Sequence, residues 1–127
     1  MTRVLVDTSV WIRHFRRTDP HLQALLAGDR VLCHPLVLLE LACGTPPAPR
    51  ARTLEDLANL DRAPEATADE ILGLVERERL HDTGCGAVDV SLLASALLAD
   101  GAKLWTDDRA LRVQAERLGV GYGVPAH

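Results

Sequence analysis

Five acidic residues stand directly beside apolar runs, and this placement restricts the possible folds of the chain more than any other feature. Asp7 follows a run of valine and leucine, Glu40 interrupts a run of leucines, and Asp89 opens a long apolar segment. Asp107 and Asp108 close a further apolar run. A carboxylate in apolar surroundings has to be protonated, paired or bound to a cation, because burying it alone costs several kcal/mol or more. The pattern therefore points to a divalent cation shared by several of these acids.

Short β-branched runs alternate with helical segments along the chain. We predict strands over residues 3–7, 31–33, 103–106 and 120–122, and helices over residues 9–15, 20–27, 35–43, 50–60, 67–80, 88–99 and 108–118. Strands separated by helices indicate a three-layer α/β/α fold around a central, mostly parallel sheet. Sites in such sheets form beyond the carboxyl ends of the strands, where Asp7 and the Asp107–Asp108 pair are expected. The chain is predicted to be one domain over residues 1–127, because its clearest loop, residues 45–49, is too short to separate two.

Charge and composition exclude several classes of protein. A net charge of −4 argues against a passive nucleic-acid coat, and an aromatic content of 3% leaves little for base-stacking platforms. If four acids form one site, the remaining charge is −4 + 4 = 0, so local arginine clusters can still bind a phosphate backbone. The candidate clusters are Arg13, Arg16 and Arg17; Arg50 and Arg52; and Arg109 and Arg112.

A cytoplasmic protein is expected. No secretion signal is visible, and no apolar run reaches the ~18 residues that a membrane span needs. Cys33, Cys43 and Cys85 are an odd number without a C-x-x-C pair, which predicts reduced, mostly buried thiols.

Each acid also has a simpler interpretation. Asp7 and Asp89 could cap the helices that follow them, and Asp108 could pair with Arg112 one helical turn later. Glu40 is harder to explain in this way, because its helical neighbours are apolar and no Arg or Lys lies between residues 32 and 48. A shared acidic site explains all of these positions together.

Four segments resemble one known family, in the family's own order. They are Val4–Ile12, His34–Gly44 with Glu40, Gly86–Ala96 with Asp89, and Leu104–Leu111 with the Asp107–Asp108 pair. Together they resemble the PIN-domain ribonucleases, and more narrowly the VapC-type toxins of type II toxin–antitoxin pairs. The resemblance extends over nearly the whole chain.

The resemblance implies a function and a set of site residues. Asp7, Glu40 and Asp89 correspond to family acids, and the family's Thr-x-Asp pattern selects Asp108 as the fourth, with Asp107 as the alternative. Ser9 and Thr106 occupy positions where the family keeps small polar residues. The implied activity is a Mg²⁺- or Mn²⁺-dependent endoribonuclease whose four acids are both catalytic and metal-binding. The expected substrate is an RNA, either a tRNA or an rRNA, and its cleavage is expected to arrest translation and growth.

The resemblance also implies partners. A cognate VapB-type antitoxin is expected to inhibit the enzyme by placing its tail in the acidic groove. A homodimer and higher toxin–antitoxin assemblies are expected as well, without any membrane association.

Two other functions fit part of the sequence. A haloacid-dehalogenase-type phosphatase would use Asp7 as nucleophile, Lys103 as phosphate partner and Asp107–Asp108 as Mg²⁺ ligands, but it leaves Glu40 and Asp89 unexplained. A non-catalytic module that binds RNA or protein would have no need of the intact acids.

Overall fold

The computed structural model describes residues 1–125. Within them, the elements follow in the order β1 (Arg3–Val6), α1 (Thr8–Arg16), α2 (Pro20–Ala27), β2 (Val31–Cys33), α3 (Pro35–Cys43), α4 (Arg50–Ala58), β3 (Asp61–Arg62), α5 (Ala68–Glu78), α6 (Ala87–Leu98), β4 (Ala102–Trp105) and α7 (Arg109–Arg117). The predicted alternation of strands and helices is confirmed, with most boundaries within one or two residues. No helix in the described part of the chain is long and apolar enough to cross a membrane.

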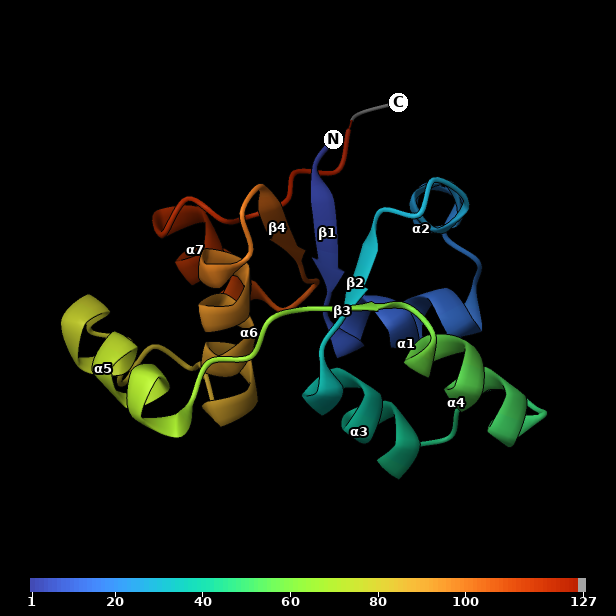
Figure 1. The fold of residues 1–127 in the computed structure, drawn as a ribbon, viewed down its shortest axis with the longest axis horizontal. Helices are drawn as coiled ribbons and strands as arrows, with labels where there is room; N and C mark the ends of the chain where they lie inside the picture. Colours follow the sequence, from blue (N-terminus) through green and yellow to red (C-terminus); the bar gives the residue numbers. More distant parts are fainter. Residues whose placement is uncertain (126–127) are drawn as a thin grey trace.

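The four strands form one parallel sheet in the order β3-β2-β1-β4. The chain runs outward from β1 through β2 to β3, and then returns to place β4 on the other side of β1 (Figure 1). The order of the strands therefore reverses between β1 and β4. In open parallel sheets this reversal opens a crevice at the carboxyl ends of the strands, and ligands bind there.

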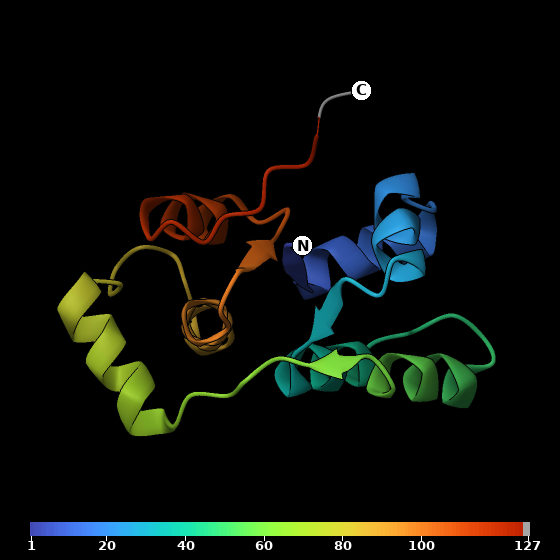
Figure 2. The ribbon, with the colours of Figure 1, turned by 45° about the horizontal axis from the view of Figure 1, so that its top comes forward.

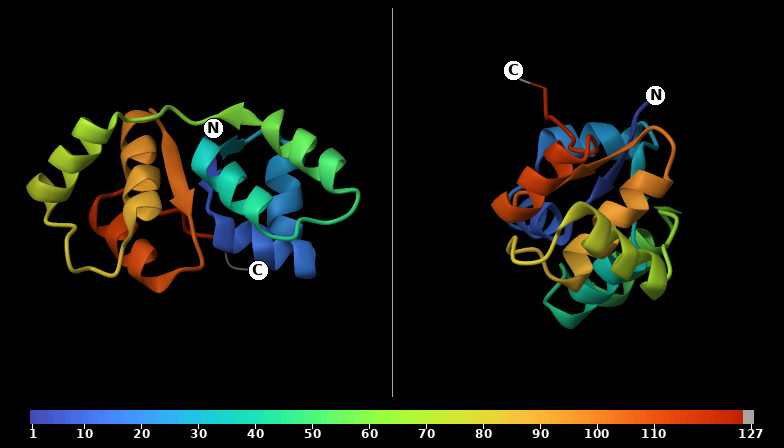
Figure 3. Two further views of the ribbon diagram at one scale, coloured as in Figure 1. Left: turned by 90° about the horizontal axis from the view of Figure 1, so that it is seen from below. Right: turned by 90° about the vertical axis from the view of Figure 1, so that its left-hand side faces the viewer.

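Helices cover both faces of the sheet. In the tilted view of Figure 2, α1 and α2 lie on one side of the strands, while α6 lies on the other with α5 outside it. Contacts of α6 with β4 and with α5 agree with this arrangement. The predicted three-layer α/β/α architecture is therefore confirmed. Figure 3 (left) looks at the edge where β1 and β4 end.

The core explains why these segments adopt their structures. Val4, Leu5 and Val6 in β1 have no exposed surface, as expected for a central parallel strand that is buried on both faces. In α6, every residue from Val90 to Ala96 is buried. A helix that is apolar on all sides has to lie inside the protein, so α6 is the internal helix of its layer.

Two elements differ from the prediction. The two-residue edge strand β3 was not predicted, because Asp61 and Arg62 are polar and exposed and carry no strand pattern. The predicted strand over 120–122 is reduced to an isolated parallel bridge between Gly121 and Leu104. Residues 126–127 of the predicted single domain lie outside the described residues.

Candidate active site

Asp7 lies at the point where β1 passes into α1, and its side chain is held by two hydroxyl groups. The residue is 6% exposed. Ser9 Oγ and Thr106 Oγ1 each donate a hydrogen bond of 2.7 Å to Asp7 Oδ2. Asp7 occupies the N-cap position of α1, but its carboxylate caps no backbone amide. The simple capping interpretation of Asp7 is therefore wrong. Its carboxylate is oriented by Ser9 in the first turn of α1 and by Thr106 directly after β4.

The same two hydroxyls fix the turn that follows β4. The amide of Asp107 donates to Ser9 Oγ at 3.0 Å, and the amide of Asp108 donates to Thr106 Oγ1 at 3.0 Å. Each hydroxyl has a single proton, which is used on Asp7, so the 3.3 Å approach between Ser9 and Thr106 is a contact without a hydrogen bond. The hydroxyls thus couple the position of Asp7 to the backbone of residues 107 and 108.

Asp89 joins this edge from the first turn of α6. Because α6 leads back to the start of β4, it runs against the strands, and its N-terminus lies at their carboxyl edge (Figure 1). Its carboxylate accepts a hydrogen bond from the Gly86 amide at 3.0 Å, so Asp89 does stabilise its helix, from the third helical position. Burial raises the pKa of Asp89, and the negative charges of Asp7, Asp108 and Glu40 raise it further. These three acids are therefore close enough to act on Asp89.

Glu40 reaches the site from α3, but not as a buried residue. The sequence placed it within an apolar stripe, and this expectation was wrong, because the buried side of α3 is formed by Val37 and Leu41 while Glu40 is exposed. Thr8 Oγ1 donates a 2.6 Å hydrogen bond to Glu40 Oε1 and so connects α3 to the residue after Asp7. Thr8 was not singled out from the sequence as a site residue, and its position next to Asp7 is the one signal in the sequence for this role.

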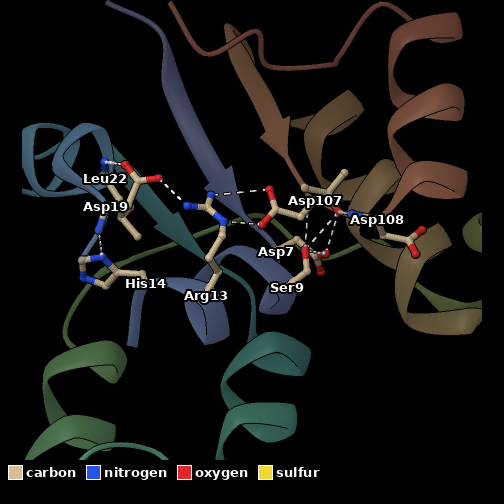
Figure 4. Close-up of polar contacts among 9 residues, drawn as sticks. Asp7, Ser9, Arg13, His14, Asp19, Leu22, Asp107 and Asp108 are labelled. Carbon is tan, nitrogen blue, oxygen red and sulfur yellow. Dashed lines mark hydrogen bonds and ion pairs between the residues drawn. The ribbon is translucent and has the colours of Figure 1, made fainter. Parts of the chain in front are cut away.

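The two neighbouring acids after β4 point to opposite sides of their turn (Figure 4). Asp107 forms an ion pair with Arg13, with its Oδ2 2.6 Å from the arginine Nε. Asp108 turns toward α7, where its Oδ2 caps the Leu111 amide at 2.9 Å, and its charge acts on Asp89. The predicted pairing of Asp108 with Arg112 is not among the ion pairs of residues 1–125.

The donor set of the site consists of carboxylates. Hard oxygen ligands of this kind suit Mg²⁺ and Mn²⁺, and neighbouring negative charges favour a divalent cation. The side chains do not form a closed coordination shell, since no three His, Cys, Asp or Glu in the described residues are grouped tightly enough to hold an ion. The chemistry of the donors thus fits a divalent metal, while Asp7, Asp89, Asp108 and Glu40 are each bonded to a local donor.

An open groove of about 380 Å³ begins beside Glu40. It is bounded by α1, the end of α3 and the loop after it, and its lining is Ile12, Phe15, Arg16, Glu40, Leu41, Gly44, Thr45, Pro46 and Pro47. Most of these side chains are apolar, so an apolar surface lies directly beside the acidic edge.

Two further expectations can be compared with the structure. Lys103, which the phosphatase alternative needs beside Asp7, donates instead to the carbonyl of Gly119 at 2.7 Å. Of the cysteines, only Cys33 is buried, while Cys43 is exposed and Cys85 is intermediate, so the expectation of mostly buried thiols was wrong.

Comparison with known proteins decides the family. Residues 4–116 match the PIN domain family. The chain belongs to the PIN-domain family. It is 50% identical over 117 residues to Ribonuclease VapC32 of two Mycobacterium tuberculosis strains, CDC 1551 / Oshkosh and ATCC 25618 / H37Rv, covering 92% of this chain and 94% of the relative. This PIN domain is thus similar to VapC-type ribonucleases, as the sequence motifs indicated.

The fold of this PIN domain also has a solved counterpart. PAE2754 from Pyrobaculum aerophilum, known from a crystal structure, aligns with a TM-score of 0.62 at 18% identity over 92% of each chain. At this identity the likeness concerns the fold alone.

Proposed function

We propose that this single-domain PIN protein is a metal-dependent endoribonuclease and the toxin of a VapBC-type pair. The observation that carries the proposal is that Asp7, Asp108 and Glu40 all lie near enough to Asp89 for their charges to act on it, with Asp7 and Asp108 following the neighbouring strands β1 and β4. The 50% identity to a protein named Ribonuclease VapC32 supports the same reaction.

Asp7 and Asp89 would hold the principal Mg²⁺ or Mn²⁺, and Glu40 and Asp108 would bind a second ion or act on the attacking water. When bound, the metal would polarise the scissile phosphate, lower the pKa of the water and stabilise the leaving oxygen. The protein's own contribution is orientation. With Oδ2 of Asp7 held by two hydroxyls, the carboxylate is kept in one orientation.

Glu40 and Asp108 can also accept the proton that water loses as it attacks the phosphate in line. Attack by water leaves a 5′-phosphate and a 3′-hydroxyl. Arginines near the site would bind the RNA backbone, while unpaired RNA loops would supply sequence choice, with tRNA or rRNA as the substrate class.

The proposed partner is a VapB-type antitoxin acting in the cytoplasm. The tail of the antitoxin would enter the acidic edge, where a basic residue of the tail would meet the negative charges. The neighbouring apolar groove beside Glu40 offers a surface for nonpolar side chains of the antitoxin. A homodimer of the toxin, and larger assemblies with the antitoxin, belong to the same proposal.

Cleavage of total RNA by the purified protein tests the activity. The reactions contain Mg²⁺, Mn²⁺ or EDTA, and the product ends are sequenced. We expect metal-dependent cuts at a few sites, lost in Asp7→Asn, whose fold is checked by circular dichroism. Full activity of Asp7→Asn would contradict the site assignment. Binding of RNA without any cleavage would instead indicate a non-catalytic module.

A further inference from the structure

Arg13, one of the arginines considered above for binding a phosphate backbone, stands at the centre of an ion-pair network next to the acidic site. Its Nε and Nη2 donate to the two carboxylate oxygens of Asp107, at 2.6 and 3.4 Å. Its Nη1 donates to Asp19 Oδ2 at 2.7 Å (Figure 4). The guanidinium also lies 5.9 Å from the centre of the Trp105 ring. A planar guanidinium with several bonds in fixed directions sets the geometry of its partners, as a lysine cannot.

The far end of this network is anchored in the fold. Asp19 uses its other oxygen to cap α2, accepting from the amides of His21 and Leu22 at 2.8 and 3.1 Å. The Asp19 amide in turn donates to His14 Nδ1 at 2.9 Å. The Asp19 carboxylate is 13% exposed, so Arg13 is attached to a well-buried and fully bonded group.

The near end of the network is the turn that carries Asp108. Asp107 and Asp108 are consecutive, and the Asp107 amide is already bonded to Ser9. With its carboxylate bound by Arg13, Asp107 is fixed at both ends, and the Asp108 side chain lies on the opposite side of the turn (Figure 4). From there its negative charge acts on Asp89.

We propose that Arg13 is a positioning residue, which holds Asp107 out of the metal site and thereby places Asp108 in it. This inference rests on the proposed function. It assigns the two acids different tasks: Asp108 serves the metal, and Asp107 is the point at which the rest of the protein holds the turn.

An electrostatic role and a positioning role of Arg13 predict opposite effects of its removal on metal binding. Arg13 is a cation beside a group of carboxylates, so its charge alone weakens metal binding, and its removal should tighten that binding. If Arg13 acts by positioning, its removal should weaken metal binding. Two variants keep the net charge constant and so isolate position: Arg13→Lys, and the double variant Arg13→Gln/Asp107→Asn, which replaces the ion pair by two neutral side chains.

The experiment measures Mn²⁺ binding by calorimetry on RNA-free protein, and in parallel kcat and KM for RNA cleavage. Loss of a direct contact to a metal ligand typically costs about 10- to 100-fold in affinity or activity. Arg13 acts on Asp108 through the neighbouring Asp107, so the lower end of this range, about 10-fold, is expected for both charge-matched variants. KM for RNA should remain within about two-fold, because a positioning residue does not touch the substrate. Arg77→Gln, which removes a surface ion pair with Glu78 on α5 and lies outside the arginine clusters considered for RNA binding, is the control and should behave as wild type.

The results separate this inference from the proposed function. Unchanged or tighter Mn²⁺ binding by the charge-matched variants overturns the inference, as does a rise in KM with kcat and Mn²⁺ affinity unaltered, which would make Arg13 an RNA contact. If Arg13→Gln/Asp107→Asn does not fold by circular dichroism, Arg13→Lys decides alone. If wild-type protein neither binds Mn²⁺ nor cleaves RNA, the proposed function itself fails, and the inference with it.

Discussion

Substitution of Thr106 by valine tests whether hydroxyl groups hold Asp7 in place. Thr106 is 4% exposed, and valine fills nearly the same volume, so no cavity should form. The variant loses a 2.7 Å hydrogen bond to a carboxylate, and bonds to charged groups contribute about 1.5–3 kcal/mol. It also leaves the Asp108 amide without its acceptor, which costs a further ~1 kcal/mol or more.

The new methyl group offsets less than about 0.8 kcal/mol of this loss. We therefore expect Thr106→Val to lower the free energy of unfolding by about 2–3 kcal/mol. For a domain of this size that corresponds to a fall in Tm of roughly 6–15 °C. Urea unfolding in EDTA gives the value directly, because Trp11 and Trp105 are both buried and report unfolding by fluorescence.

Thr106→Ser is the matched control, since it keeps the hydroxyl and loses one buried methyl group, at a cost of about 1 kcal/mol. In an Asp7→Asn background the effect of Thr106→Val should shrink, because the lost bond is then to a neutral acceptor. The reasoning fails if Thr106→Val lies within about 0.5 kcal/mol of wild type, or if the serine variant is as unstable as the valine variant.

Three further outcomes follow from the structure. Burial lowers the pKa of His34, whose Nδ1 accepts a hydrogen bond from the Leu36 amide. The contribution of His34 to stability should therefore be full above the unfolded pKa of about 6.5 and decline as the pH falls below it. Urea unfolding at pH 7.5 and at pH 5 should show a smaller decline for His34→Asn than for wild type. Leu92→Ala, at a position in α6 with no exposed surface, should cost about 2–5 kcal/mol in the same assay, and a loss below that range would mean that the helix is less tightly packed than described. Iodoacetamide should modify exposed Cys43 in the native protein long before Cys33, because burial raises the pKa of the Cys33 thiol to about 11. Mass spectrometry of the labelled peptides measures the order, and earlier labelling of Cys33 would contradict the prediction.

The sequence predicted those parts of the fold that depend on local pattern. The apolar run of residues 4–6 and the proline at the start of α3 each define an element by themselves, and both were predicted correctly. The strand β3 could not be found in this way, since Asp61 and Arg62 are extended because they pair with β2. Pairing across the sheet is a tertiary effect, and a polar segment of two residues has no sequence pattern that would predict it.

The candidate site shows the same limit. The position of Asp7 at a strand end followed from the pattern, whereas the exposure of Glu40 did not, because the helix face that packs inward is decided by neighbouring elements. Asp107 and Asp108 are adjacent, and the sequence could not separate them beyond a family motif. The ion pair of Asp107 with Arg13, ninety-four positions away, distinguishes them in the structure.

The pairing of β1 with β4 determines when the site can form during synthesis of the chain. Val6 is matched with Trp105, and the Asp7 carboxylate is bonded by Thr106, ninety-nine positions later. A chain emerging from its N-terminus carries Asp7 and Glu40 early, together with the Ser9 and Thr8 hydroxyls that bond to them, but it lacks Thr106 and Asp108 until β4 has been made. Contacts between residues so far apart in the sequence form slowly in folding. The set of side chains that meets at this edge is therefore complete only when β4 has paired with β1.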